Sequence, residues 1–436
     1  MERDITEQLR EWKKKKKRKP LIIRGARQVG KTWIIKHFAS TDYKDSAYFV
    51  CDKNNSRLMG IFSAGFDCER IISLLELECG HKISKGETLI ILDEIQEIPR
   101  ALESLKYFYE NAPEYQIIAA GSLMGIALHQ GTSFPVGKVD ELFLYPLSFA
   151  EFLDASNLHG MRELLENNDL TAIQAFSEKF TEQLKYYYLV GGMPEAVELW
   201  RDEQDLSEVR RIQKNLLDFY DNDFSKHTPE NQIVKVREVW NSLLKQLTKE
   251  NRKFIYGLIR SGSRAKEYEY AINWLKDYGI IRIIKRISKP GIPLKAYEDN
   301  NAFKIYMLDT GLMCAMGDLE PAVILDGSDL FEEFKGALTE QFVCQELTPM
   351  YREQLYYWSA DNSIGEIDFV LQLKTTVVPL EVKAAENLKA RSLRAFCDKY
   401  ELRGVRTSLS GYREQEWMVN VPLYMIREYL QEKSKI

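Results

Sequence analysis

The feature that most constrains the fold of this chain is an apolar run that breaks into a turn framed by glycines. Residues 21 to 32 read LIIRGARQVGKT and fit the pattern G-x-x-x-x-G-K-[ST], with Gly25, Gly30, Lys31 and Thr32 at its fixed positions. Glycines let the backbone curl so that successive N–H groups point at phosphate oxygens, while the lysine reaches the outer phosphates and the threonine hydroxyl is offered to Mg²⁺. The run before the turn predicts a buried strand, and TWIIKHF predicts a helix whose N-terminus attracts an anion.

A second motif lies downstream, in TLIILDEIQEIP at residues 88 to 99. The run reads as a buried strand that ends in Asp93 and Glu94. An acid at the carboxyl end of a central strand can hold the water shell of Mg²⁺, and a second carboxylate beside it can activate the attacking water. Two solvated acids at the tip of an ordinary strand are the alternative, but the phosphate loop upstream favours a nucleotide site.

Length and composition bound the classes of protein that the chain can form. At 436 residues it exceeds one compact core, so two or three domains are expected. The net charge of -5 gives no global signature of nucleic-acid binding, so any such contact needs a local patch. The six cysteines are scattered without a C-x-x-C pair, which favours reduced thiols in a cytoplasmic protein over zinc or disulfide sites. No apolar run has membrane-spanning length and no secretory leader is evident, so no membrane partner is expected.

Residues 1 to 155 alternate helical and strand patterns, which predicts a parallel α/β sheet. YQIIAAGS, residues 115 to 122, is expected to be a buried strand that ends in Ser122. This serine stands where additional-strand ATPases keep a polar sensor that positions the lytic water. It is equally well placed to cap the next helix, so both interpretations stay open.

The hydrophobic patterns in the middle of the chain predict two further segments. Residues 156 to 228 read as helices, and residues 229 to 320 read as helices followed by two strands, which is compatible with a winged helix. Helix 264 to 278 would then be its recognition helix. That helix carries both cations and acids, and such mixed charge is poor for reading a major groove. A packing or protein-contact role is therefore favoured over DNA binding.

Residues 321 to 436 hold a second constellation of acidic residues. Asp368 is expected on one strand, and Glu381 and Lys383 on one face of the next strand. Two carboxylates could hold a second divalent metal while the lysine steadies a hydroxide or a phosphate, and Glu340 on the preceding helix could complete the metal shell. The alternative is an amphipathic hairpin in which Lys383 and Glu381 form an exposed ion pair.

Taken together, the motifs resemble a prokaryotic family of AAA-type P-loop ATPases that carry a C-terminal domain of unknown function. The resemblance rests on RGARQVGKT, LDEIQEIP, AAGSLMG, LYPLSFAEFL, YLVGGMPEAV, KIYMLDTGL, GEIDFV and PLEVKA, in this order along nearly the whole chain. It implies an α/β fold with an AAA-type P-loop core and its parallel sheet at 1–155, a helical lid at 156–228, a winged-helix segment at 229–320 and a restriction-endonuclease-like PD-(D/E)xK domain at 321–436.

The same resemblance implies roles for particular residues. Asp93 would serve Mg²⁺, Glu94 would be the hydrolytic base, and Asp368, Glu381 and Lys383 match the nuclease-like signature. The nucleotide would be bound by the loop residues Gly25, Ala26, Arg27, Gln28, Val29, Gly30, Lys31 and Thr32. One departure concerns Gly137-Lys138, where the family pattern leads us to expect Gly-Arg. An arginine there could act on the γ-phosphate of a neighbouring subunit in a homo-oligomer, whereas a lysine lacks the planar fork.

Two functional hypotheses follow. In the first, Mg-ATP hydrolysis controls a C-terminal DNA-binding or nuclease-like module. In the second, the protein is a nucleotide-dependent switch that binds a protein partner, and its nuclease-like domain is inactive. A GTP-specific protein is disfavoured because the chain shows no convincing N-K-x-D motif.

Overall fold

The computed structural model describes residues 1–122, 134–249, 253–327, 332–360, 365–384 and 390–435. The chain divides into two compact units. The smaller unit holds residues 2–145 with 277–279, and the larger unit holds Met1, 146–276 and 280–436.

The smaller unit is built on a five-stranded sheet in the order β2-β3-β4-β1-β5, and every neighbouring pair in it is parallel. Because the strands are parallel, their carboxyl ends share one edge of the sheet, where the residues after β1, β3 and β4 meet. The strands are β1 Leu21–Arg24, β2 Asp45–Val50, β3 Thr88–Asp93, β4 Gln116–Gly121 and β5 Asp140–Phe143.

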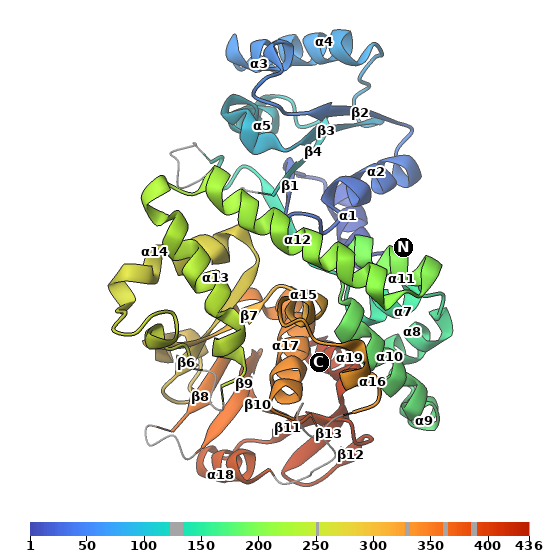
Figure 1. The fold of residues 1–436 in the computed structure, drawn as a ribbon. Coiled ribbons are helices and arrows are strands. Elements are labelled where there is room, and N and C mark those ends of the chain that lie inside the picture. The colour runs from blue at the N-terminus through green and yellow to red at the C-terminus, as the bar shows by residue number, and fades with distance from the viewer. Residues whose placement is uncertain (123–133, 250–252, 328–331, 361–364, 385–389, 436) are drawn as a thin grey trace. The chain divides into compact units, whose positions relative to one another are not determined.

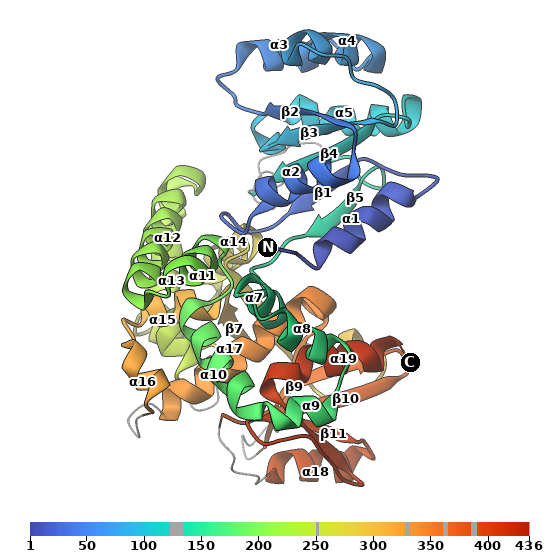
Figure 2. The ribbon, with the colours of Figure 1, turned by 90° about the vertical axis from the view of Figure 1, so that its right-hand side faces the viewer.

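Helices cover both faces of this sheet, as Figures 1 and 2 show. On one face, α3, α4 and α5 pack their apolar stripes against alternate strand residues such as Ile90 and Ile117. On the other face, α2 contacts β2, β3 and β4, and α1 contacts α2. The helices are α1 Ile5–Lys14, α2 Lys31–Asp42, α3 Ser56–Ser63, α4 Cys68–Cys79 and α5 Pro99–Asn111.

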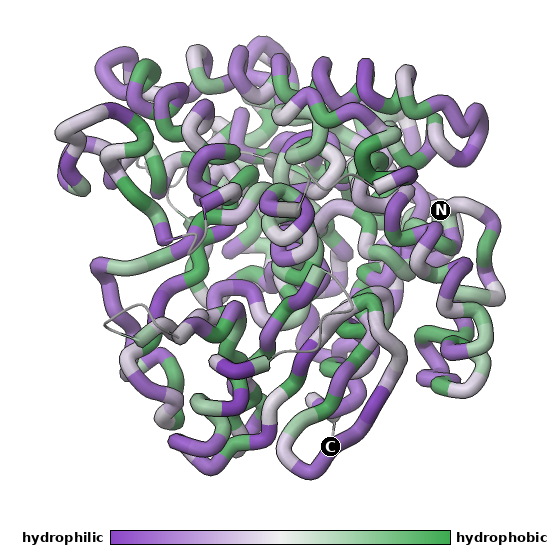
Figure 3. The backbone as a smooth tube through the Cα atoms, turned by 60° about the horizontal axis from the view of Figure 1, so that its bottom comes forward, coloured by the Kyte–Doolittle hydropathy of each residue, from purple (hydrophilic) through white to green (hydrophobic). Residues whose placement is uncertain are grey.

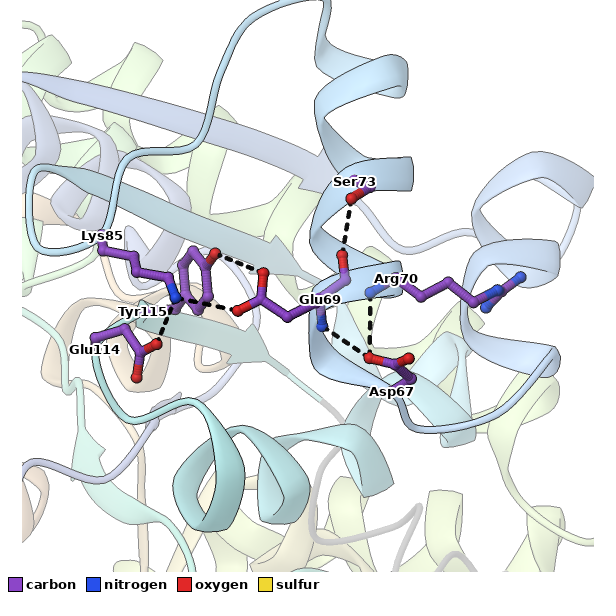
Figure 4. A network of polar contacts seen from close by, with 7 residues as sticks. All are labelled: Asp67, Glu69, Arg70, Ser73, Lys85, Glu114 and Tyr115. Atoms are coloured by element: carbon purple, nitrogen blue, oxygen red, sulfur yellow. Dashed lines mark hydrogen bonds and ion pairs between the residues drawn. The ribbon is translucent and has the colours of Figure 1, made fainter.

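A polar network on the surface ties α4 to the segments that precede β3 and β4 (Figure 4). Lys85 Nζ lies 3.1 Å from a carboxylate oxygen of Glu69 and 2.7 Å from one of Glu114. The Tyr115 hydroxyl donates to Glu69, and Asp67 caps α4 by accepting from the first backbone N–H groups of the helix. Exposed ion pairs of this kind contribute little free energy each, so the network fixes local geometry rather than overall stability.

The larger unit contains an eight-stranded mixed sheet in the order β12-β13-β11-β10-β9-β8-β6-β7. The hairpin β6–β7 and the meander β8–β9–β10 are antiparallel, whereas β10, β11 and β13 run parallel to one another. The strands are β6 Ile281–Ile287, β7 Glu298–Met307, β8 Tyr356–Ser359, β9 Glu366–Leu373, β10 Thr376–Val382, β11 Gly404–Ser408, β12 Arg413–Glu414 and β13 Met418–Pro422.

Within this unit α18 packs on β9, β10 and β11, while α17 contacts β7 and β10 and α19 contacts β13 (Figure 2). Green and purple alternate along most helices in Figure 3, as amphipathic helices require. The helices are α7 Phe149–Ala155, α8 His159–Glu166, α9 Leu170–Ala175, α10 Ser177–Val190, α11 Pro194–Glu203, α12 Leu206–His227, α13 Ile233–Leu247, α14 Ala265–Tyr278, α15 Thr310–Met316, α16 Pro321–Leu325, α17 Glu332–Tyr351, α18 Arg391–Tyr400 and α19 Ile426–Lys435.

A buried polar network inside the larger unit explains two of the sequence motifs. Asp309, at the end of KIYMLD, accepts hydrogen bonds from the backbone N–H of Gly192 at 2.6 Å and from the Gln345 side chain at 3.0 Å. The helix corner GGMP thereby joins α17 through one carboxylate. A Cβ on Gly192 would lie 2.1 Å from the carbonyl oxygen of Leu147. This close packing leaves room only for glycine at this position.

The predicted α/β class is confirmed, with a parallel sheet in the N-terminal part and a mixed sheet in the C-terminal part. A separate winged helix is not confirmed, because the expected wing, β6–β7, is part of the same sheet as β8 to β13. The parallel pairing of β6 with β8 makes this connection, and no local pattern in the sequence announces it. The division into four segments stays a prediction.

None of the helices in the described ranges combines the length and the apolar character that crossing a membrane requires.

Candidate functional site

The phosphate-loop motif lies between β1 and α2, where the sequence predicts it. Gly30 adopts a left-handed conformation with φ 92°, which permits the sharp entry into α2, and no side chain caps the helix. A helix that starts without a side-chain cap offers backbone N–H donors and the positive end of its dipole to an anion. The loop therefore has the donor set that a phosphate group needs.

Gly25 is required for a different reason. A Cβ at this position would lie 2.3 Å from the carbonyl oxygen of Leu144, the residue after β5. The backbone N–H of Leu144 in turn donates to the Arg24 carbonyl at 2.8 Å. The first glycine of the motif thus allows the loop to pack against the end of β5.

Lys31 is buried, with 6% of its surface exposed. Its ammonium group donates to the carbonyl oxygens of Ala26 at 2.7 Å and Gly25 at 3.1 Å, inside the loop itself. Burial lowers the pKa of Lys31 to about 8, although Glu94 and Asp93 oppose this change. Burial thus makes the charged form of Lys31 less stable than in water. A bound anion beside the ammonium group would stabilise that charged form again.

Thr32 and Asp93 are brought together across the carboxyl edge of the sheet. The Thr32 hydroxyl donates to Asp93 Oδ2 at 2.7 Å, and the Tyr48 hydroxyl donates to the same oxygen at 2.8 Å. Sequence reasoning missed Tyr48, which reaches the site because β2 pairs with β3. A hydroxyl and a carboxylate are the hard oxygen ligands that Mg²⁺ prefers, so these two residues fit that ion.

Glu94 lies beside this pair and is oriented by two neighbours. The Gln96 side-chain amide donates to Glu94 Oε2 at 2.6 Å, and the Ser122 hydroxyl donates to the same oxygen at 3.0 Å. Glu94 has φ 50°, a left-handed value that costs free energy in a non-glycine residue and that occurs often at functional sites. The amide oxygen of Gln96 is buried without a hydrogen-bond partner. Sequence reasoning did not single out Gln96, although it stands two residues after Glu94.

The structure describes Ser122 as a neighbour of Glu94. The helix that Ser122 would cap in the alternative interpretation falls at residues 123–133, outside the described residues. Lys138 pairs with Glu110 of α5 at 2.8 Å and lies above the Tyr109 ring. Its side chain is thus engaged within the same unit.

The C-terminal constellation is partly assembled. Asp368 sits on β9 at a point where the register with β8 shifts, and its Oδ2 accepts the backbone N–H of Val382 at 2.8 Å. Lys383 Nζ lies 2.9 Å from Glu381 Oε1, while Glu381 Oε2 is buried without a hydrogen-bond partner. Burial raises the pKa of Glu381, and Lys383 opposes the change.

Glu340 is held by other residues. It accepts a hydrogen bond from the Tyr306 hydroxyl at 3.0 Å and lies 3.7 Å from Lys304 Nζ. Lys304 is fully buried and also pairs with Glu366. Among the described residues, no three histidine, cysteine, aspartate or glutamate side chains gather as a metal site would require.

Comparison with known families matches three consecutive parts of the chain. Residues 17–153 match an AAA domain, residues 181–323 match a domain of unknown function (DUF8612), and residues 335–425 match a domain of unknown function (DUF4143). No curated protein is recognisably similar in sequence.

Two solved structures show limited similarity. The Walker-type ATPase PABY2304 of Pyrococcus abyssi is 16% identical with a TM-score of 0.45, over 72% of this chain and 94% of its own. The Aeropyrum pernix ORC1 protein in complex with DNA is 12% identical with a TM-score of 0.30, over 72% of this chain and 90% of its own. Both TM-scores are low, so the assignment of the N-terminal domain rests on the family match and on the geometry of the phosphate loop. The chain combines an AAA-type P-loop domain with a C-terminal DUF4143 domain.

Proposed function

We propose that this protein binds ATP with Mg²⁺ and hydrolyses it at the carboxyl edge of the parallel sheet. The observation that carries the proposal is the contact between Thr32 and Asp93, which joins the two motifs at 2.7 Å. The contact supports one shared ligand because it places a hydroxyl and a carboxylate, both suitable for Mg²⁺, beside the phosphate loop.

The residues present support distinct roles. Thr32 and Asp93 would hold Mg²⁺, which supplies charge neutralisation on the phosphates when it is bound. Lys31 would move from the loop carbonyls to the outer phosphates, and the loop N–H groups from Gly25 to Thr32 would hold the remaining oxygens. Glu94 would accept a proton from the attacking water, and Gln96 and Ser122 would orient its carboxylate.

ATP turnover of the full-length protein tests the proposal. Lys31→Ala should abolish nucleotide binding. Glu94→Gln should still bind ATP, but its rate of ATP hydrolysis should be lower by about 100-fold or more. Glu97→Gln, three residues away in the turn Ile95–Glu97, is the matched control and should hydrolyse ATP normally. Unchanged turnover in Glu94→Gln would remove this residue as the base, and ATP binding by Lys31→Ala would overturn the site itself.

A second proposal concerns the C-terminal domain: that ATP hydrolysis controls a DNA-binding or nuclease-like module. The buried, unpaired oxygen of Glu381 favours it, because a buried carboxylate oxygen without a hydrogen bond is costly unless it serves a ligand. Asp368 and Glu381 would hold a divalent ion, since Mg²⁺ is often bound by only one or two carboxylates together with substrate phosphates.

Incubation of supercoiled DNA with Mg²⁺ or Mn²⁺ tests this second proposal. Nicking that is lost in Asp368→Ala and Lys383→Ala, and kept in the control Lys399→Ala, would support it. Intact DNA in all conditions, together with ATP-dependent association with another protein, would favour the alternative of a protein-binding switch with an inactive nuclease-like domain.

A further inference from the structure

A run of cations connects the first helix of the smaller unit to its first strand. Residues 13 to 19 read KKKKKRK and lie where α1 ends and before β1 begins. The field at the C-terminus of a helix accounts for Lys13 and Lys14, because both lie in the last turn of α1 and the effect falls off beyond that turn. Lys16 and Lys17 lie past the end of the helix, so their charges contribute little to its stability.

The backbone of this connection is held at both ends. The indole N–H of Trp12 donates to the Lys19 carbonyl at 2.8 Å, and the Arg18 guanidinium donates to the Lys13 carbonyl at 2.9 Å. Trp12 is itself buried, and the guanidinium carbon of Arg18 lies 5.4 Å from the centre of its ring. The lysines between these anchors are thus presented on a defined loop, so less conformational entropy is lost when a partner binds them.

Three lysines of the connection carry its free charge. Lys14, Lys16 and Lys17 are exposed, and within the described ranges they form no ion pair with an acid. We call these three residues the lysine turn. Lys15, which stands among them, is instead paired with Asp140 of β5 at 3.0 Å. The lysine turn is therefore the part of the run that is available to a partner.

The acids around the lysine turn do not neutralise it. Asp42 pairs with Arg10 at 3.6 Å, and Glu110 pairs with Lys138 at 2.8 Å. Glu11 on α1 is exposed and has no ion-pair partner in the part of the chain that the structure describes. Three unpaired cations thus stand beside one unpaired acid, and the charge of this surface favours a polyanion.

The apolar residues of the region favour a nucleic acid over a membrane. Segments that bind a lipid surface combine cations with exposed large apolar side chains that enter the bilayer. The apolar residues Ile5, Leu9 and Trp12 of α1 are all buried, so this helix offers no apolar face to lipid. Val136, in the segment before β5, is exposed but too small to anchor a protein by itself. The phosphates of a nucleic acid, by contrast, are matched by cations alone.

We propose that the lysine turn binds the phosphate backbone of a nucleic acid without regard to base sequence. Lysine is a point charge that lacks the planar fork with which arginine reads bases, and phosphate contacts position a strand without selecting its sequence. Each ammonium group that meets a phosphate releases a counterion, so the binding depends on salt. The contact requires neither ATP nor the acidic cluster around Asp368 and Glu381.

Fluorescence anisotropy of a labelled DNA duplex of random sequence measures the binding to the full-length protein. The titrations contain no ATP, and EDTA removes the divalent ion that the acidic cluster would need. The salt concentration is varied between about 50 and 200 mM. In the combined variant Lys14→Gln, Lys16→Gln and Lys17→Gln, the slope of log Kd against log salt should fall by about two to three, because each phosphate contact contributes about 0.9. Its Kd at the lowest salt should rise by about tenfold or more.

A matched control separates the lysine turn from the net charge of the protein. The combined variant Lys53→Gln, Lys82→Gln and Lys179→Gln removes the same number of charges from exposed lysines elsewhere in the chain. Its slope should equal that of the wild type, and its Kd should stay within a factor of two. An equal loss of affinity in this control would overturn the proposal, because net charge alone would then explain the binding.

Two further variants separate charge from folding. Arginine at all three positions of the lysine turn keeps the charges, so this variant should bind as the wild type does. Lys16→Glu combined with Lys17→Glu reverses two charges outside α1 and should weaken binding further than the neutral variant. If the neutral variant has a lower unfolding midpoint, these two variants decide the question, and equal Kd values for both of them would contradict the proposal.

A wild-type slope that persists in the neutral variant would also overturn the proposal, as would the absence of duplex binding at the lowest salt. Vesicles that contain phosphatidylserine test the membrane alternative. Binding of the wild type to these vesicles but not to the duplex, with loss in the neutral variant, would assign the lysine turn to a lipid surface instead.

Discussion

The P-loop site and the C-terminal acidic cluster both place a carboxylate and a lysine near the ends of buried strands, yet they differ in how completely their groups are paired. Asp93 accepts from two hydroxyls and Glu94 from an amide and a hydroxyl. In the C-terminal cluster, one oxygen of Glu381 has no partner and Glu340 is held by Tyr306 and Lys304.

This difference indicates two degrees of preorganisation. At the P-loop site, neighbouring side chains hold each carboxylate in place before a ligand arrives, which reduces the reorganisation needed during the reaction. In the C-terminal cluster, the carboxylate that would hold a metal has an unsatisfied oxygen, so the protein alone bears a desolvation cost. Removal of a carboxylate charge should therefore lower ATP turnover at the P-loop site, whereas in the C-terminal cluster it should raise the stability of the fold.

The largest effect should come from charge removal at Asp93, with Asp368 as the comparison. Asp93→Asn keeps the size of the side chain but removes a ligand charge for Mg²⁺, so ATP turnover should fall by about 100-fold or more. Asp368→Asn should change ATP turnover by less than a factor of two, since it lies in the other unit. Steady-state hydrolysis at saturating Mg²⁺ measures both, and equal losses would show that the two sites act as one.

The packing of the loop predicts the next largest effect. Gly25→Ala places a Cβ against the Leu144 carbonyl, and because this neighbour is backbone, the substitution should cost about 3 kcal/mol of unfolding free energy. Gly60→Ala, in α3 with open space around it, should instead stabilise by up to about 1 kcal/mol. Denaturant unfolding measures both variants, and a neutral Gly25→Ala would contradict the close approach.

The pKa of Lys31 predicts a dependence of ATP affinity on pH. Because burial lowers it to about 8, the ammonium form that binds phosphate predominates below that pH and is lost above it. Affinity should therefore fall by up to about tenfold for each pH unit above 8. Lys31→Arg remains charged throughout, so its affinity, although lower, should stay constant between pH 7 and pH 9 in calorimetric titrations.

The unpaired oxygen of Glu381 predicts a gain of stability when this side chain loses its charge. Burial raises the pKa of Glu381 in the folded state, so the stability that this group contributes is present at low pH and is lost as the pH rises through the raised value. Glu381→Gln should stabilise the protein by about 1 kcal/mol at pH 8 and by almost nothing near pH 4. Substitution of the exposed Glu416 by Gln is the control. Destabilisation by Glu381→Gln at pH 8 would contradict the interpretation that Lys383 compensates the buried charge only in part.

The smallest effect should come from Tyr48. Tyr48→Phe removes one of the two hydroxyl donors to Asp93 and leaves the Thr32 contact, so the Mg²⁺ concentration for half-maximal turnover should change only a few-fold. Thr32→Val, which removes the other hydroxyl, is the comparison and should have a larger effect. The reverse order would assign the main role at Asp93 to the tyrosine.

The sequence predicted where the residues of the P-loop motif and the acidic motif lie in the N-terminal sheet, because the parts of each motif are local. Glycine spacing and the acidic strand end each identify a turn or a strand tip from a few adjacent residues, and a parallel sheet then brings the two tips to one edge. Tyr48 was missed because its contribution depends on which strand lies beside β3.

The sequence by itself determined the class of the N-terminal fold. It also placed the turn from Gly25 to Thr32 after one strand and the acids Asp93 and Glu94 at the end of another, because steric requirements act there over a few bonds. Only the tertiary structure decided that β6–β7 joins the C-terminal sheet and that Glu340 pairs with Tyr306. Strand pairing and side-chain partners across elements depend on the packing of the whole core, which no local pattern encodes.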